Sequence, residues 1–304
     1  MTKILLLLSL IATLSGFTCS EDGKDGFLPE NELYISEGMK GANAMEESQF
    51  NDTISSVETV FAPIVSSLGG KLQVFRKWDD GTVNAYAKRT GNIYEVHMFG
   101  GLARHATVTL DALALVMCHE IGHHIGGAPK KGAMWASNEG QSDYWASLKC
   151  LRKVWLNEDN KEVICKMSVP THVTTQCNSI WSKEADQSIC VRSSMAGLSV
   201  GNMFAALRNG PSPKFDTPDK NVVASTDHNH PATQCRLDTY FNGALCDMDD
   251  NTDVDQKDEK IGTCMADAES KKTIGTRPLC WFKSGGTTIG QTPGKWWLDQ
   301  SVHF

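Results

Sequence analysis

The sequence predicts an α+β fold, mostly helical with a small sheet, and three features carry this prediction. Apolar residues between positions 49 and 67 recur at the spacing of one helix face. Two runs, 71–78 and 93–99, are rich in the β-branched and aromatic residues that are typical of strands. A later apolar run leads into His119 and His123, whose i, i+4 spacing places both side chains on one face of a helix.

Composition is that of a globular protein. The 304 residues are enough for one large domain with a sizeable core. Hydrophobic residues make up 40% of the chain and charged residues 21%. The net charge of −7 argues against a surface that binds nucleic acid or an anionic membrane.

Residues 1–19 are typical of a secretory signal peptide, in which Lys3 precedes a short apolar core over residues 4–14. That core is shorter than a membrane span, and no later stretch is long and apolar enough to form one. Cys19 raises the alternative of a lipid anchor, although Phe and Thr before it are bulky for a lipid-attachment signal. We therefore expect an exported protein, periplasmic or secreted. The alternatives are a lipid-anchored protein and a buried N-terminal helix.

The elements of the first half follow one another in order. A polar, glycine-containing stretch over 20–48 is expected to be a flexible leader. The helix over 49–67 ends at a glycine pair, and strands are expected over 71–78 and 93–99. Turns that contain Gly81 and Gly91 lie between them, on either side of residues 82–87.

Two helices then carry the polar motifs. Thr107 or Thr109 can cap the first, which ends at the glycine pair 126–127. Asn138 is a good cap for the second. Residues 157–192 are polar and contain cysteines, which indicates a surface insertion.

The ten cysteines, together with export, favour disulfides. No C-x-x-C pair is present, which argues against a structural zinc site held by cysteines. Cys118 lies inside the histidine-bearing helix and is expected to be a buried free thiol. The eight cysteines that follow it can form four bridges, and the sequence does not pair them: Cys150, Cys165, Cys177, Cys190, Cys235, Cys246, Cys264 and Cys280.

The motif H-E-x-x-H predicts a zinc site. His119 and His123 can hold one Zn²⁺, and Glu120 can reach a water on the metal. Glu139, at the start of the next helix, is the best candidate for the third ligand, and Asp143, one turn later, can orient a ligating histidine. The alternatives are a core helix that happens to contain histidines and, for Glu139, an acid favoured by the helix dipole.

This ligand set predicts hydrolysis with one catalytic zinc ion. Zinc lowers the pKa of a bound water towards ~7. Glu120 then acts as general base and passes the proton to the leaving amine. His124 points about 100° around the helix, so we expect it near the ligands or exposed.

The ordered set of motifs resembles the zincin-like (gluzincin) metallopeptidases that include the heat-shock protease HtpX, the CAAX prenyl protease and the mitochondrial protease Oma. The resemblance covers roughly residues 50–240. Five segments match in order: Asn84-Ala85-Tyr86-Ala87, the turn and strand over 91–102, His119 to His123, Glu139 to Asp143, and His230-Pro231 with Arg236.

The resemblance implies further roles. His230 would steady the oxyanion, Asn84 would face the same cleft, and Arg236 would pair with acids that brace the site. Residues 93–99 would be the edge strand that binds an extended peptide, which makes recognition mostly backbone-driven. Without the resemblance, we would interpret His230 as a loop histidine and Asn84 as a turn asparagine.

The implied function is a zinc-dependent endopeptidase that acts on protein substrates. The alternatives are a catalytically silent zincin that binds or scaffolds other proteins, and a metal-dependent amidase of cell-wall peptides. Ser142 departs mildly from the family pattern, which usually has alanine there. The expected organisation is a signal peptide at 1–19, a leader at 20–48, a peptidase domain at 49–245 with its insertion at 157–192, and a cysteine-containing extension at 246–304.

Residues 247–258 raise the further alternative of a calcium loop. Oxygen-bearing side chains occupy positions 1, 3, 5, 7, 9 and 12 of the calcium-loop register. Thr252 stands where the loop needs glycine, and Asp258 where it prefers glutamate, which weakens the match. A solvated acidic loop is the other interpretation.

Overall fold

The structure is a computed structural model that describes residues 26–39, 45–131, 135–266 and 274–283. The expected signal peptide, with Cys19, lies outside the described residues. The described helices and strands are, in order, η1 (Glu37–Met39), α1 (Glu47–Ser67), β1 (Lys71–Lys77), β2 (Ala85–Thr90), β3 (Ile93–Phe99), α2 (Gly100–Ala103), α3 (Leu110–Ile125), α4 (Glu139–Trp145), η2 (Ala146–Cys150), α5 (Leu151–Val154), α6 (Asn160–Cys165), α7 (Thr171–Ile180), α8 (Glu184–Leu207) and α9 (Thr233–Leu245).

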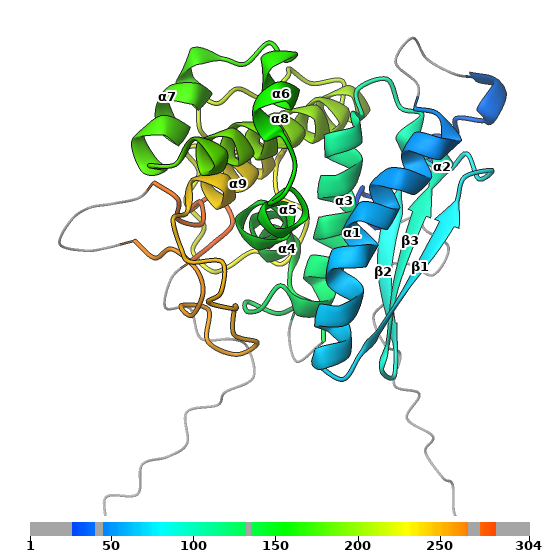
Figure 1. Ribbon diagram of the computed structural model, residues 1–304, viewed down its shortest axis with the longest axis horizontal. Coiled ribbons are helices and arrows are strands. Elements are labelled where there is room, and N and C mark those ends of the chain that lie inside the picture. Colours follow the sequence, from blue (N-terminus) through cyan, green and yellow to red (C-terminus); the bar gives the residue numbers. More distant parts are fainter. Residues whose placement is uncertain (1–25, 40–44, 132–134, 267–273, 284–304) are drawn as a thin grey trace, which may run out of the picture.

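The sheet has the strand order β1-β3-β2, so β3 is its central strand (Figure 1). β3 pairs in parallel with β1 and antiparallel with β2, to which a tight turn between Thr90 and Ile93 joins it. The expectation that residues 93–99 form a peptide-binding edge is therefore wrong, because both hydrogen-bonding sides of β3 are already paired. The outer strands are β1 and β2, and β2 packs against α3.

Helix α3 runs through the centre of the molecule, with α1 and the sheet on one side and α4 and α8 on the other (Figure 1). Every residue of α3 after Leu110 is buried. Apolar side chains of α1, the sheet and α3 share one core cluster. Because water cannot reach them, the polar side chains of α3 must find partners within the protein.

Helices α4, η2 and α5 form one continuous helical stretch, and η2 is a π-helical turn within it. Gly122 allows α3 to approach this stretch closely. A Cβ at Gly122 would come within 3.2 Å of the Ser142 Cα and 3.1 Å of the Trp145 ring. The close approach brings the histidines of α3 beside the first turn of α4.

The second half of the chain packs around α8 and α9. The segment expected as a surface insertion, 157–192, forms α6, α7 and the beginning of α8. Helices α7, α8 and α9 share a smaller core cluster. Trp281 and Phe282 of the C-terminal extension pack against Tyr144 of α4.

Part of the leader is packed rather than loose. Phe27 and Leu28 are fully buried, and both belong to the core cluster that contains α3. Residues 26–28 of the stretch expected to be flexible are therefore packed against the core.

Four disulfides connect the described residues, and one of them corrects a prediction. Cys118 is not a free thiol, because α3 and η2 face each other with the Cα atoms of Cys118 and Cys150 only 5.6 Å apart. Cys165, expected in a bridge, is exposed and free. The bridges are Cys118–Cys150, Cys177–Cys190, Cys235–Cys280 and Cys246–Cys264.

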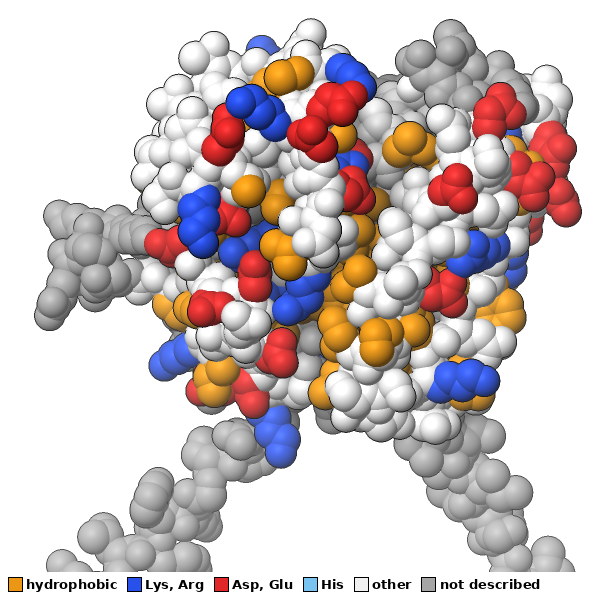
Figure 2. Space-filling view, viewed as in Figure 1, with side chains coloured by type: hydrophobic (Ala, Val, Ile, Leu, Met, Phe, Trp, Pro, Cys, Tyr) orange, Lys and Arg blue, Asp and Glu red, His pale blue; other side chains and the backbone are white. Residues whose placement is uncertain are grey.

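Charges of both signs are interspersed on the face shown in Figure 2, and neither sign forms a continuous patch there. Among the described residues, no helix is both long enough and apolar enough to cross a membrane.

The bridge between α3 and η2 should contribute strongly to stability. Replacing both Cys118 and Cys150 with Ala removes the constraint on a loop with a sequence separation of 32. We expect the free energy of unfolding to fall by about 3–4 kcal/mol. Urea unfolding followed by tryptophan fluorescence measures the change. The matched control, Cys165→Ala, should leave the midpoint unchanged, and an equal midpoint for the double variant would contradict the pairing.

Candidate metal centre

The two helices that carry the ligand candidates both begin at a side-chain cap. The Thr109 hydroxyl accepts a hydrogen bond from the amide of Ala112, and the Asn138 side chain accepts one from the amide of Gln141. These caps fix where α3 and α4 begin. The side chains that face each other across the two helices are set by those starting points.

His119, His123 and Glu139 converge on one point. His119 Nε2 lies 3.4 Å from Glu139 Oε2, and His123 Nε2 lies 3.7 Å from Glu139 Oε1. Both ring nitrogens and Glu139 Oε2 are buried without a hydrogen-bond partner, which is costly unless a cation binds them. Ligands about 2.0 Å from a tetrahedral zinc ion stand about 3.3 Å apart. The donor set and its spacing therefore fit zinc.

Hydrogen bonds to the outer ring nitrogens orient both histidines. His119 Nδ1 donates to Asp143 Oδ1 at 2.7 Å, and His123 Nδ1 donates to the backbone carbonyl of Ser137 at 2.8 Å. The Ser142 hydroxyl lies 3.1 Å from the same nitrogen of His123. Because each Nδ1 carries the proton, each Nε2 keeps its lone pair for a metal ion.

Asp143 is itself held by a buried network. Its Oδ1 accepts from Arg236 Nη2 and from the Tyr240 hydroxyl, both at 2.6 Å, as well as from His119. Asp143 and Arg236 are fully buried. The network ties α3 and α4 to α9.

The charges around the ligands favour a cation. Burial opposes ionisation of Glu139 and Asp143, but the neighbouring histidines and Arg236 respectively hold their pKa values below the ordinary range. Burial likewise opposes a charge on His119, but Asp143 and Glu139 outweigh it and raise the pKa of this ring to about 9. A histidine that binds a metal must be neutral, and with His119 neutral the two ionised carboxylates face one guanidinium. A bound metal ion would offset this excess negative charge.

Glu120 is a carboxyl group without partners. It is fully buried, and neither of its oxygens has a hydrogen-bond partner within the described parts of the chain. Burial raises the pKa of Glu120 to about 8. A carboxyl group with free oxygens and a pKa near neutrality is suited to take up and return a proton.

The residues assigned by family resemblance lie around this group. His230 Nε2 is 3.3 Å from Glu139 Oε2 and 2.7 Å from the Gly26 carbonyl oxygen. Arg236 lies behind Asp143. Asn84, directly before β2, bonds to both backbone groups of Leu28. His230 thus joins the ligand group, whereas the Asn84 side chain bonds to the N-terminal segment and to the amide of Ala85.

Sequence reasoning missed three contributors. The Ser137 carbonyl has no sequence signal, because every residue carries one. Tyr240 follows Arg236 at i, i+4 on α9, so the position of Arg236 could have suggested it. Phe27, whose ring centroid lies 4.8 Å from that of His119, sits in a polar stretch that looks like a linker.

His124 is neither exposed nor turned toward the ligands. Its ring stacks between Tyr94 and Trp135, at centroid distances of 4.9 and 4.7 Å. Its Nε2 donates to the backbone carbonyl of Glu95 at 3.0 Å. The expectation of exposure is wrong because this face of α3 packs on the sheet, and His124 links the helix to β3.

The acidic segment 247–258 packs as a structural loop. The carbonyl oxygens of Asp249 and Asp250 accept from Lys149 and Lys153, at 2.6 and 3.0 Å. Among the described residues, the groups able to hold a metal include no acid of this segment. The calcium alternative is therefore unsupported.

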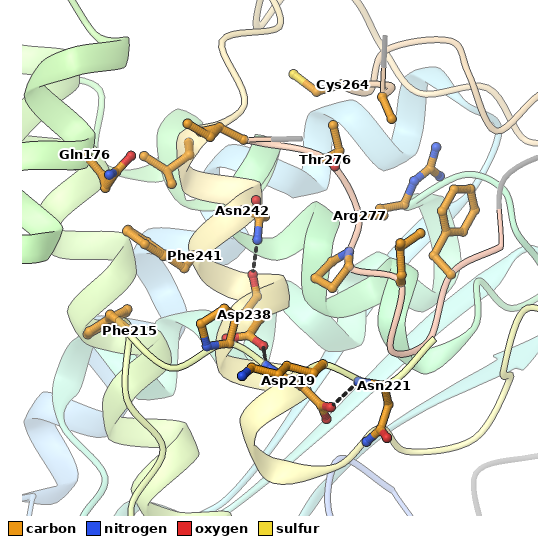
Figure 3. A pocket seen from close by; sticks show the side chains of 18 of the residues that line it. Gln176, Phe215, Asp219, Asn221, Asp238, Phe241, Asn242, Cys264, Thr276 and Arg277 are labelled. Carbon is orange, nitrogen blue, oxygen red and sulfur yellow. Dashed lines mark hydrogen bonds between the residues drawn. The ribbon is translucent and has the colours of Figure 1, made fainter. Parts of the chain in front are cut away.

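A cavity of about 670 Å³ lies between α7, α9 and the C-terminal extension, and none of the ligand residues lines it (Figure 3). The Asp238 carboxylate accepts from the amide of Asp219, whose own carboxylate accepts from the amide of Asn221. These polar groups are satisfied within the cavity wall (Figure 3).

Neutralising Asp143 should weaken metal binding. In Asp143→Asn the orienting charge behind His119 is lost, and we expect zinc affinity to fall about 10–100-fold. Competition with a zinc-sensitive dye measures the dissociation constant. The matched control is Asp111→Asn, which breaks another buried ion pair, with Arg192, at the other end of α3. The control should lower stability and leave zinc affinity intact, and equal zinc affinity in both variants would contradict the orienting role.

The segment that holds the ligand candidates also matches a known protein family. The model described as Peptidase family M48 matches residues 49–188, a segment that includes α1, the sheet, α3 and α4. No curated protein and no solved structure matches the chain. The matched segment holds all three ligand candidates and has the zincin-like α+β fold that the motifs imply. The resemblance is thereby confirmed over residues 49–188, which match peptidase family M48, a family of metallopeptidases.

Proposed function

We propose that this metallopeptidase is a zinc-dependent endopeptidase that hydrolyses peptide bonds of protein substrates. One observation carries the proposal: a buried carboxyl group without partners, Glu120, adjoins a three-residue ligand group whose own atoms lack partners. These three residues would hold zinc, and three protein ligands rather than four are the pattern of catalytic rather than structural zinc.

The residues divide the chemistry between them. Zinc held by His119, His123 and Glu139 supplies a Lewis acid and a water of lowered pKa. Glu120 takes a proton from water and returns it to the leaving amine. His230 donates from Nε2 to the carbonyl oxygen of the cleaved bond as negative charge develops there. The role of His230 is supported by the 3.3 Å distance between its Nε2 and Glu139 Oε2, which places the ring beside the ligand group.

The peptide substrate binds along β2 rather than β3. β2 is an outer strand and packs against the helix that carries the zinc ligands. At its start, the Ala85 carbonyl oxygen accepts a hydrogen bond from the backbone amide of Phe27 at 2.8 Å. Hydrogen bonds to the backbone of a peptide do not depend on its side chains, so such a site accepts many sequences. This suits a protease of unfolded or extended segments.

The protein acts outside the cytoplasm, in the periplasm or in the extracellular medium. Four disulfides join the described residues, and such bridges persist in oxidising compartments. The signal peptide expected at residues 1–19 accords with this location.

Replacing Glu120 tests the proposal. Glu120→Gln keeps the shape of the side chain but removes its ability to take a proton, so we expect cleavage of casein to fall by about 10²–10⁴-fold. Zinc content should stay unchanged, because Glu120 is not a ligand. Rates from a fluorescent casein assay and metal analysis of the same sample measure both.

The matched control is Glu47→Gln, an exposed acid in the first turn of α1, which should retain the activity of the unsubstituted protein. Undiminished cleavage by Glu120→Gln would refute the catalytic role. Zinc binding without turnover of any unfolded protein, in the unsubstituted chain as well, would favour a binding or scaffold function.

A further inference from the structure

The N-terminal segment Gly26-Phe27-Leu28 binds beside the catalytic group through its backbone. The Phe27 amide donates to the Ala85 carbonyl of β2 at 2.8 Å. The Leu28 amide donates to Asn84 Oδ1 at 2.9 Å, and the Leu28 carbonyl accepts from Asn84 Nδ2 at 3.2 Å. The beginning of β2 is therefore engaged by the chain's own backbone, as it would be by a bound peptide.

Two carbonyl groups of the segment contact the residues that serve the chemistry. The Gly26 carbonyl oxygen accepts a hydrogen bond from His230 Nε2 at 2.7 Å. The proposed mechanism requires the same hydrogen bond from His230 to the carbonyl oxygen of a substrate. The Phe27 carbonyl accepts from Arg236 Nη1 at 3.0 Å, and Arg236 also holds Asp143. The peptide unit between Gly26 and Phe27 thus lies next to the metal ligands.

The Phe27 side chain fills a position lined by residues of three helices. Its ring lies 4.8 Å from the His119 ring, edge to face, and 5.6 Å from the Phe204 ring. The Arg236 guanidinium lies 4.6 Å from the ring centre. Phe27 has no exposed surface. The position accommodates a large apolar side chain directly behind a zinc ligand.

We propose that Gly26-Phe27-Leu28 is an internal inhibitor that occupies the substrate position, and that the site takes peptides with a large apolar residue in the place of Phe27. This inference rests on the proposed endopeptidase function. Substrate and segment compete for the same donors and acceptors, namely Ala85, Asn84 and His230. The resting protein therefore opens its site only when the segment leaves.

The backbone of the segment explains how it can occupy the site as an inhibitor. The Gly26 amide donates to the Leu28 carbonyl at 3.1 Å, which closes a bend. A peptide that binds by strand addition must be extended, whereas the backbone of this segment is bent. The segment therefore blocks β2 without being laid out as an extended substrate.

Gly26 provides a specific way to displace the segment. A Cβ at Gly26 would collide with the carbonyl oxygen of Ala85, part of the β2 backbone, which cannot easily move. By contrast, a Cβ at Gly38 in η1 would meet nothing within 4 Å. Gly26→Val should expel the segment, and Gly38→Val is the matched control.

The test uses the full zinc-loaded chain with Glu120→Gln in every sample, so that the probe is bound but not cut. The probe is a fluorescent peptide copy of residues 25–30, and fluorescence anisotropy gives its dissociation constant. We expect Gly26→Val to bind the probe about tenfold more tightly than Gly38→Val, because the free fraction of the site rises. A probe with Asp in the place of Phe27 should bind neither variant.

Equal affinity in the two variants, or equal binding of the two probes, would overturn the inference. Gly26→Val could fail to fold, so a second measurement uses the Glu120→Gln chain with both glycines intact. It follows hydrogen exchange of the backbone amides of Phe27 and Leu28. Both amides should exchange slowly, and saturating probe should accelerate them by displacing the segment; unchanged exchange at saturation would also overturn it. If Gly26→Val binds the probe but the same variant with Glu120 restored cleaves nothing, the endopeptidase proposal fails while the occupancy stands.

Discussion

The site depends on one buried oxygen atom, Oδ1 of Asp143, which accepts hydrogen bonds from His119, Arg236 and Tyr240. An isolated charge at this depth would cost several kcal/mol, and the pairing with Arg236 offsets that cost. The three donors come from α3 and α9, whereas the acceptor comes from α4. The orientation of a metal ligand and the packing of three helices are therefore set by the same contacts, so a change that loosens the helices also misplaces the ligand.

Arg236 connects this network to the peptide position. One of its terminal nitrogens holds Asp143, and the other holds the Phe27 carbonyl. Its planar group also lies over the Phe204 ring, at 4.2 Å from the ring centre. A lysine could not make both hydrogen bonds in one plane. The Phe27 carbonyl thus completes the hydrogen bonding of the residue that holds Asp143, so the position of the N-terminal segment and the orientation of His119 are coupled through one side chain.

Local patterns in the sequence predict those parts of the site that lie within single helices. His119 with His123, and Glu139 with Asp143, repeat at i, i+4, so helix geometry alone places each pair on one face. The order of the strands is not a local property, and for this reason residues 93–99 could be identified as a strand but not as the central one. The partner of Cys118 likewise depends on which helix faces α3. Phe27 was missed because its polar neighbours conceal its burial, which tertiary contacts with other elements decide.

Helix α3 is constrained on every face that the structure describes. His119 and His123 face α4, Cys118 is bridged to η2, and His124 is stacked and hydrogen-bonded to the sheet. A helix held in three directions can neither rotate nor shift without breaking a disulfide or a buried hydrogen bond. Access to the metal group must therefore be controlled by what lies against it. The segment that begins at Gly26 lies in that place, and among the described residues no disulfide retains it. The physical division of the molecule is thus between a fixed core that carries the candidate metal ligands and a segment of its own chain that packs against them without a covalent link.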